Sequence, residues 1–394
     1  MNKFLLHEAV QEFIRENLHS DLSRIILKGS PFPEVSIQEI ATQIIGLKTA
    51  EKKFPDFFST KNIIFPPGLN LEQASSEVTA EYKASLISGK SLLDITGGFG
   101  IDSFYFSQKV EKLSYCEINK GLAEIAAHNF KVLKAQNIQA NNVNAMDLLK
   151  NASEVYDWIF ADPARRDIHG GKVFRLSDCQ PDIPAHLELL WARGKHILIK
   201  TSPLLDLHAG IEELQNVAEI HIVAVENEVK ELLWLLQINA SEEIKVKTIN
   251  FQKKGNQWFE AVLSAEKRET AYSLPEKYLY EPNAAIMKSG CFKKLAEVTQ
   301  TKKLQVNSHL YTSDKIKNFP GRAFEVVDIM EFNKKDLKKN FSGKKANITT
   351  RNFPLSVAEI RKKFKIKDGG KDYLFFTTSL EEEKIVLVCK KVNV

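Results

Sequence analysis

The stretch SLLDITGGFGID, residues 91–102, decides the fold of this chain. Its first residues form a short apolar run of the kind that a buried parallel strand needs. Residues 96–100 then let the backbone turn sharply and approach a ligand without a Cβ in the way. Residues 101–108 carry the apolar and aromatic side chains of a packed helix. A strand that feeds a glycine turn at the start of a helix is typical of nucleotide-type ligand sites.

The glycine spacing distinguishes two ligand classes. The dinucleotide fingerprint G-x-G-x-x-G requires a third glycine, and Ser103 occupies that position here. The spacing instead resembles motif I of class I methyltransferases that use S-adenosylmethionine (AdoMet), usually acidic-x-Gly-x-Gly-x-Gly. The four corresponding positions are Asp94, Thr96, Gly98 and Gly100. This resemblance implies that the turn, Gly97 included, cradles the methionine part of AdoMet, with Asp94 near its ammonium group. Thr96 departs from the pattern at the first glycine.

Three further predicted strands each end near an acidic residue. The strand KLSYCEI ends near Glu117, and the strands IQANNV and YDWIFA are followed by Asp147 and Asp162. Glu117 lies about 20 residues past the glycines, where an acid accepts ribose hydroxyls. Asp147 is predicted either to face the adenine or to serve only as a helix cap. Open α/β sheets bind ligands at the carboxyl ends of their strands, so these acids predict one shared site.

The segment DPARR, residues 162–166, follows the fourth strand. It resembles the Asp/Asn-Pro-Pro-aromatic motif of enzymes that methylate exocyclic amines of bases. It keeps Asp162 and Pro163 but lacks the aromatic residue. We expect Asp162 to orient or deprotonate the nucleophile. Arg165 and Arg166 are predicted to bind a phosphate, to stack on a base, or to pair with nearby aspartates.

The segment LNLEQASSEVTAEYKA precedes the first strand and is predicted to be a loop that enters a helix. Methyltransferases often cover the methionine end of AdoMet with such a segment. Gln73, Ser75 and Thr79 are the polar candidates, although helix capping explains Ser75 equally well. Asp102, just inside the helix that follows the glycines, is expected to help fix the turn.

Composition limits the classes of protein and partner. The chain has 394 residues and a formal net charge of +5, and it contains no apolar stretch long enough to span a membrane. Its four cysteines are far apart and its histidines show no metal-ligand spacing, so we expect a cytoplasmic protein without a metal site. Residues 301–394 hold 21 Lys and Arg against 11 Asp and Glu, which favours a polyanionic partner.

Several longer segments together resemble one bacterial family, the class I AdoMet methyltransferases with a THUMP-like C-terminal domain. The segments are LNLEQASSEVTAEYKA, LLDITGGFGIDSF, DPARR, IKTSPLLD, EPNAAIMKSG, SHLYTSD with FPGRAFEV, and DGGKDYLFFTT. The resemblance implies an α/β fold with a Rossmann-like core over residues 65–270. Before it, apolar residues at spacings of three and four predict a helical domain over residues 1–64. It also implies a ferredoxin-like domain over residues 271–322 and a basic THUMP-like domain over residues 323–394.

The resemblance implies AdoMet-dependent methyl transfer but does not supply the substrate. The basic C-terminal part favours a base in structured RNA, either tRNA or rRNA, as the acceptor. Two alternatives stay open: methylation of a protein or small molecule, and an inactive methyltransferase fold that binds RNA. In the C-terminal part, residues 280–283 are predicted to start a loop and residues 284–297 to form one helix. Residues 308–314 are predicted to form another ordered loop.

Overall fold

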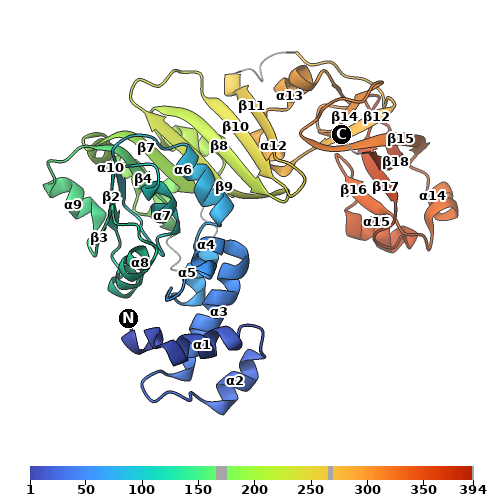
Figure 1. Ribbon diagram of the computed structural model, residues 1–394. Helices are drawn as coiled ribbons and strands as arrows, with labels where there is room; N and C mark the ends of the chain where they lie inside the picture. The colour runs from blue at the N-terminus through green and yellow to red at the C-terminus, as the bar shows by residue number, and fades with distance from the viewer. Residues whose placement is uncertain (166–174, 265–268, 393–394) are drawn as a thin grey trace. The chain divides into compact units, whose positions relative to one another are not determined.

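The computed structural model describes residues 1–165, 175–264 and 269–392 (Figure 1). The chain divides into two compact units. The first contains residues 1–217 and 234–240, and the second contains residues 218–233 and 241–394.

The first unit begins with several helices, and the sequence indicates where the longest of them starts. In the N-terminal part, Ser36 and Glu39 form a capping box at the start of α3, as their spacing indicates. The helices of this unit are η1 (Lys3–Leu6), α1 (Glu8–Glu16), α2 (Leu22–Lys28), α3 (Ile37–Lys53), α4 (Pro55–Ser59), α5 (Gly68–Gln73), α6 (Glu77–Ser85), α7 (Ile101–Ser107), α8 (Lys120–Val132), α9 (Ala145–Asn151), η2 (Leu176–Asp178), α10 (Ile183–Trp191) and α11 (Leu207–Glu213). Within the described residues, no helix is long and apolar enough to cross a membrane.

The strands of the first unit form a parallel sheet. They are β1 (Ser91–Asp94), β2 (Lys112–Cys116), β3 (Ile138–Asn141), β4 (Tyr156–Ala161) and β7 (Gly194–Thr201), with the two-residue strands β5 (Ala164–Arg165) and β6 (Cys179–Gln180) paired separately. Their order in the sheet is β3-β2-β1-β4-β7, and every neighbouring pair is parallel. The order reverses between β1 and β4, which is where open α/β sheets place their ligand crevice.

The same sheet continues in the order β7-β9-β8-β10-β11 to reach nine strands. These strands are β8 (Val217–Val225), β9 (Glu228–Gln237), β10 (Lys245–Phe251) and β11 (Gln257–Val262). Glu226 and Asn227 connect β8 to β9, and both have positive φ angles, as a tight two-residue turn requires. The predicted hairpin around residues 254–256 is confirmed, because β10 and β11 pair antiparallel.

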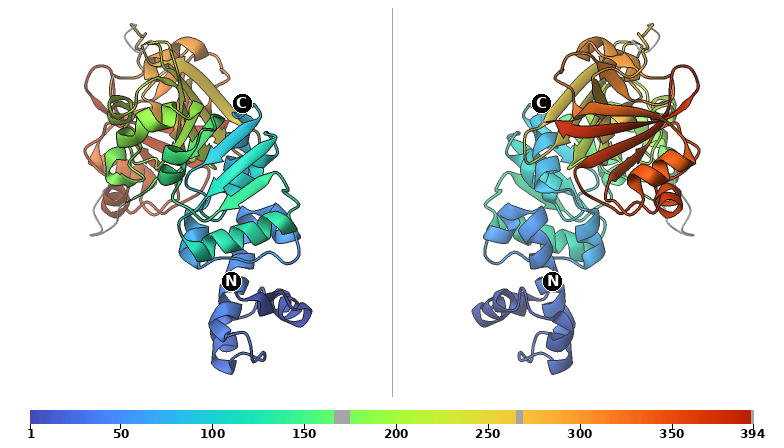
Figure 2. Two further views of the ribbon diagram at one scale, coloured as in Figure 1. Left: turned by 90° about the vertical axis from the view of Figure 1, so that its left-hand side faces the viewer. Right: turned by 90° about the vertical axis from the view of Figure 1, so that its right-hand side faces the viewer.

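A seven-stranded sheet forms most of the second unit, in the order β13-β14-β12-β15-β18-β17-β16. Its elements are β12 (Tyr278–Pro282), α12 (Ala284–Ser289), α13 (Phe292–Thr299), β13 (Lys302–Lys303), β14 (Tyr311–Ser313), β15 (Gly321–Glu331), α14 (Lys334–Phe341), β16 (Asn347–Thr350), α15 (Val357–Phe364), β17 (Asp372–Thr378) and β18 (Lys384–Val392). The red strands and the orange helices are visible together in Figure 2, right.

Both faces of this second sheet are buried, as the alternation along β17 shows. Leu374 and Phe376 pack in one cluster with residues of α14 and α15. Phe375 points to the other face and packs with Leu279 and Phe324. Strand β15 pairs with β12 on one side and β18 on the other, so the sheet runs without a break through residue 322. The predicted domain boundary there stays a prediction.

Several local predictions are wrong in this region. Residues 280–282 complete strand β12 rather than starting a loop, because Pro282 is the last residue of that strand and no ladder partner needs its missing N–H. The predicted helix over residues 284–297 is broken at Gly290, where φ is +71°. The loop predicted over residues 308–314 contains strand β14.

Candidate active site at the carboxyl ends of the parallel strands

In the turn between β1 and α7, Gly97 and Gly100 pack against aromatic rings, whereas Gly98 borders open space. A Cβ on Gly97 would lie 2.2 Å from the ring of Tyr115, and one on Gly100 would lie 2.6 Å from Phe130. Gly98 differs, because the nearest atom to its Cβ would be the Thr96 carbonyl oxygen at 3.7 Å. Gly98 and Gly100 have φ angles of +57° and +87°, which favour glycine. The turn therefore exposes its backbone at Gly98.

Asp94 is the last residue of β1 and is almost completely buried, at 1% exposure. Its Oδ1 accepts a hydrogen bond from the Thr96 N–H at 2.9 Å, and its Oδ2 accepts one from the Ser103 hydroxyl at 2.6 Å. Burial raises the pKa of the Asp94 carboxyl to about 7, against the lowering effect of these two hydrogen bonds. The negative charges of Asp102 and Asp162 also raise this pKa.

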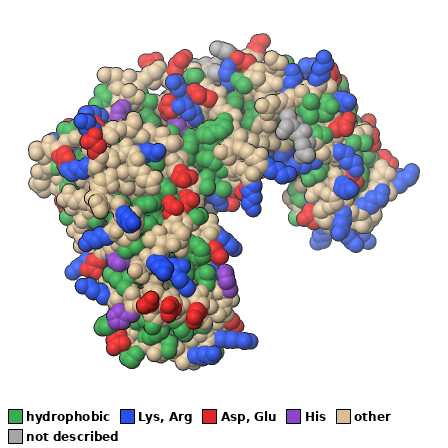
Figure 3. Space-filling model, in the orientation of Figure 1, with side chains coloured by type: hydrophobic (Ala, Val, Ile, Leu, Met, Phe, Trp, Pro, Cys, Tyr) green, Lys and Arg blue, Asp and Glu red, His purple; other side chains and the backbone are tan. Residues whose placement is uncertain are grey.

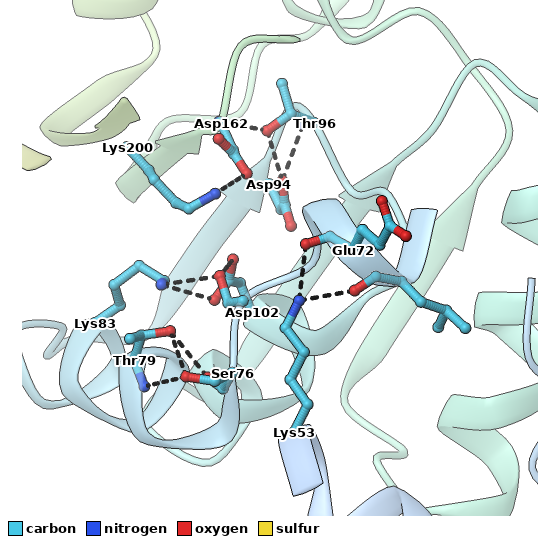
Figure 4. Close-up of polar contacts among 12 residues, drawn as sticks. Lys53, Glu72, Ser76, Thr79, Lys83, Asp94, Thr96, Asp102, Asp162 and Lys200 are labelled. Atoms are coloured by element: carbon cyan, nitrogen blue, oxygen red, sulfur yellow. Dashed lines mark hydrogen bonds and ion pairs between the residues drawn. The ribbon is translucent and has the colours of Figure 1, made fainter. Parts of the chain in front are cut away.

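Thr96, the residue that departs from the glycine pattern, connects two strand ends. Its hydroxyl accepts a hydrogen bond from the Asp162 N–H at 2.7 Å and lies 3.4 Å from Asp94 Oδ1 (Figure 4). A glycine at this position would have no atom to make these contacts. The threonine thus fixes the ends of β1 and β4 relative to each other, on either side of the ligand crevice.

Glu117 follows β2 and faces the glycine turn. Its Oε2 accepts a hydrogen bond from the Gly98 N–H at 2.9 Å, and its Oε1 accepts one from the Asn119 N–H at 2.7 Å. Each carboxylate oxygen retains a second lone pair. The Tyr115 hydroxyl donates a hydrogen bond to the Gly98 carbonyl at 2.6 Å. Gly98 is therefore hydrogen-bonded through both its N–H and its carbonyl, to Glu117 and Tyr115 respectively.

Near the predicted adenine position, the structure offers apolar side chains as well as Asp147. Asp147 lies in α9 and is exposed, and its Oδ1 is 3.8 Å from Lys150 Nζ. Two exposed apolar side chains, Ile118 at 65% and Val143 at 39%, follow β2 and β3 instead. Asn142 donates hydrogen bonds to the carbonyls of residues 117 and 118, which brings these two strand ends together. Exposed Ile and Val after adjacent strands form an apolar surface suited to a planar ring.

Asp162 follows β4 and forms an ion pair that the sequence analysis did not include. Lys200 Nζ donates to Asp162 Oδ2 at 2.5 Å, and β7 places Lys200 beside Asp162 because Ile199 pairs with Ala161 (Figure 4). Pro163 is buried. The backbone of Arg165 belongs to β5. Arg166 lies outside the described residues.

A second buried pair lies between α6 and α7. Lys83 is completely buried, and its Nζ is 3.2 Å from Asp102 Oδ1 and donates to Ser75 Oγ at 3.0 Å (Figure 4). The Ser75 hydroxyl donates to Asp102 Oδ2 at 2.8 Å. The other two predicted residues are not part of this network: Gln73 is exposed at the end of α5, and the buried Thr79 hydroxyl donates to the Ser76 carbonyl.

The structure therefore brings together three predicted acids, Asp94, Asp102 and Asp162, and two lysines that sequence reasoning missed. One signal was available for Lys200, since it is a charged residue at the end of the apolar strand KHILIK. Lys83 gave no such signal, because a lysine in a helix is usually exposed.

Two family models match the C-terminal part of the chain. One describes a ferredoxin-like domain and matches residues 278–320, and the other describes a THUMP domain-like module and matches residues 321–391. No protein of curated function matches the sequence.

A solved structure matches this chain over nearly its whole length. A candidate methyltransferase from Porphyromonas gingivalis W83 is 32% identical, with a TM-score of 0.86, and the match covers 99% of this chain and 99% of that chain. An rRNA methylase from Streptococcus thermophilus is 13% identical over 41% of this chain and 93% of that one, with a TM-score of 0.30. A candidate methyltransferase from Streptococcus mutans, in complex with SAH, is 12% identical over 41% of this chain and 97% of that one, with a TM-score of 0.29. The two partial matches are too weak to bear on activity.

Proposed function

This chain belongs to the family of class I methyltransferases that carry ferredoxin-like and THUMP-like domains at the C-terminus, and on that basis we propose that it methylates a base in structured RNA with AdoMet as the methyl donor. The observation that carries the proposal is the glycine turn surrounded by Asp94, Glu117 and Asp162 at the ends of adjacent parallel strands. Because the four cysteines lie far apart in the sequence, we also propose that the reaction takes place in the cytoplasm.

The residues of the turn fit AdoMet. The open space beside Gly98 leaves room for a ligand against the backbone, where a side chain would block it. Glu117 retains lone pairs for ribose hydroxyls, and the exposed Ile118 and Val143 offer an apolar surface for the adenine. Asp147, exposed on α9, stays a prediction for the adenine amine. Bound AdoMet supplies an electrophilic methyl group on its sulfonium sulfur.

In this proposal Asp162 orients the acceptor and takes up its proton. The Lys200 ammonium group contacts one oxygen of the Asp162 carboxylate and holds it in place, and a carboxylate accepts a hydrogen bond or a proton. The backbone after Asp162 is ordered by the pairing of β5 with β6. This arrangement fixes one carboxylate beside the turn, so that the acceptor is positioned before reaction. Pro163 and the two following arginines are proposed to contact the substrate.

The THUMP-like part supplies the basic surface expected of an RNA-binding module. Residues 334–371, from α14 to the start of β17, hold 13 Lys and Arg against 3 Asp and Glu. The lysines of α14 are exposed, and blue side chains gather over this part of the molecule in Figure 3. Such a concentration of positive charge suits the phosphate backbone of RNA.

The test combines cofactor binding with methyl transfer. Calorimetric titration with S-adenosylhomocysteine (SAH) should give roughly micromolar affinity, about −8 kcal/mol. Tritiated AdoMet should then label tRNA or rRNA. Glu117→Ala should weaken SAH binding, because the ribose hydroxyls lose their acceptor. Asp162→Ala should abolish labelling of RNA while SAH affinity is kept.

Each alternative has its own outcome in these assays. Tritium in protein or in a small molecule, but not in RNA, would favour the second candidate substrate class. Absence of SAH binding would favour an RNA-binding protein with an inactive methyltransferase fold. Unchanged SAH affinity in Glu117→Ala would show that the cofactor lies elsewhere.

A further inference from the structure

Three buried polar atoms without a hydrogen-bond partner lie in one part of the second unit. They are His309 Nδ1, Arg351 Nε and Thr377 Oγ1, and the described residues contain only two other side-chain atoms of this kind. Buried polar atoms are normally paired, because an unpaired one loses its hydrogen bonds to water without compensation. A group of three such atoms points to a ligand.

Arg351 and Thr377 are neighbours across the strands β16 and β17 (Figure 1). The register pairs Thr350 with Phe376, and the Arg351 N–H donates a hydrogen bond to the Phe376 carbonyl at 2.9 Å. Arg351 therefore lies beside Thr377 at the end of the ladder. Thr377 is completely buried, and the alternation along β17 places its side chain on the same face of the sheet as Phe375.

The loop that carries His309 packs on this same face. Leu310, the next residue, belongs to the buried cluster that contains Phe375. The Asn352 side chain donates a hydrogen bond to Gln305 Oε1 at 3.0 Å, which connects the loop to the residues after β16. The packing and this hydrogen bond bring the three polar groups together, although they come from three separate segments of the chain.

All three groups can donate a hydrogen bond, and their surroundings are positively charged. Arg Nε is only a donor, and a threonine hydroxyl and one ring nitrogen of a neutral histidine also donate. Burial and the positive charges of Lys303 and Arg351 lower the pKa of His309 to about 4. The buried Glu281 carboxylate is bonded to Arg351 and also to Arg322, so it balances only one of these two cations. Donors in positive surroundings favour a ligand with several acceptor oxygens and a negative charge.

We propose that His309, Arg351 and Thr377 form a binding site for one oxyanion of the phosphate type. Each of the three groups would donate a hydrogen bond to an oxygen of the anion, and Arg351 would also contribute charge. The Arg351 side chain is 29% exposed, which gives the anion a route from solvent. The anion is either free phosphate or the phosphate group of a nucleotide. The site lies in the second unit and does not depend on the proposed methyl transfer.

Thermal unfolding of the full chain in phosphate, compared with KCl of equal ionic strength, tests this site. At about ten times its Kd, phosphate should raise the melting temperature of the wild-type chain by roughly 2–4 °C relative to KCl. Thr377→Val keeps the shape of the side chain, removes the hydroxyl and should lose most of this rise. In phosphate-free buffer the same variant should be at least as stable as the wild-type chain, because its unpaired hydroxyl is gone.

Arg361→Gln is the matched control for the loss of a positive charge. Arg361 lies on α15, which packs through Ile360 and Phe364 on the opposite face of the sheet. This variant should keep the full rise in phosphate. His309→Phe provides a second test if Thr377→Val fails to fold, because it keeps the stacking on Phe292, removes the ring nitrogens and should also lose the rise.

Uridine 5′-monophosphate and uridine distinguish the two sources of the anion. A larger rise with the monophosphate than with phosphate, and none with uridine, would assign the site to a nucleotide phosphate group. A rise with phosphate alone would assign it to the free ion. A full rise in both Thr377→Val and His309→Phe would place the anion elsewhere and overturn the proposal. No rise in the wild-type chain would also overturn it, and a loss of stability in phosphate-free Thr377→Val would then show that the hydroxyl binds water.

Discussion

Asp94 couples the protonation of one buried carboxyl to the stability of the whole fold. Its pKa is about 7 in the folded chain, against an ordinary value of 3.8. Between these two pH values the folded state holds a proton that the unfolded state has lost. The free energy of unfolding therefore falls as the pH rises from about 4 to 7, and Asp94 adds no further change above that range.

We expect Asp94→Asn to remove this dependence, because the amide stays neutral at every pH. The variant should gain stability relative to the wild-type chain as the pH rises, by up to about 4 kcal/mol between pH 4 and pH 8. Urea unfolding of both proteins at several pH values measures the difference. A stability difference that is constant across that range would contradict the raised pKa.

Lys200 is expected to hold the Asp162 carboxylate in position for the acceptor. Replacement by Met removes the cation 2.5 Å from the Asp162 carboxylate. The rate of RNA methylation should drop about 10- to 100-fold, because the carboxylate loses the partner that orients it. Lys200→Arg keeps the charge and should recover part of the rate. SAH affinity should stay the same in both variants, and a loss of SAH affinity as large as the loss of rate would show a merely structural role.

At the scale of elements, substitutions at two glycines of the turn, Gly97 and Gly98, are expected to have different effects. Gly97→Ala places a Cβ against the buried Tyr115 ring, and we expect a loss of about 1–3 kcal/mol in the free energy of unfolding. Gly98→Ala meets open space, so its loss of stability should be limited to about 1 kcal/mol from the positive φ. SAH affinity should nevertheless fall strongly in Gly98→Ala, because the methyl group occupies the space assigned to the ligand. Parallel thermal unfolding and calorimetry test this contrast, which would be refuted if Gly98→Ala kept full affinity.

The strands beside this turn show how much of the site could be predicted from the sequence. The strands β1, β2 and β4 were predictable because each contains a short apolar run, and the acids followed from their place near the ends of the strands. The Lys200–Asp162 pair was not predictable, because the two residues are 38 positions apart and meet only through strand pairing. Strand β12 was hidden by Pro282, a residue that reads as a turn signal but is tolerated at the end of a strand.

At the scale of the molecule, the charges are divided between the parts in a way that predicts separate roles. The acids that follow the parallel strands serve the proposed cofactor site in the first unit, whereas the lysines of residues 334–371 lie in the second. Binding of RNA and binding of SAH should therefore be separable by mutation.

Four lysines of α14, namely Lys334, Lys335, Lys338 and Lys339, are exposed and replaceable by Gln without loss of helix propensity. The fourfold variant should bind RNA at least tenfold more weakly at low salt, because fewer counterions are released. The slope of log affinity against log salt should become shallower by roughly 0.7–0.9 for each lysine that contacts a phosphate. Lys48→Gln with Lys52→Gln, two exposed positions on α3, is the control and should change neither quantity. SAH affinity should be the same in all these proteins. An equal loss of RNA affinity in the control, or an unchanged salt slope in the α14 variant, would show that the RNA does not use this surface.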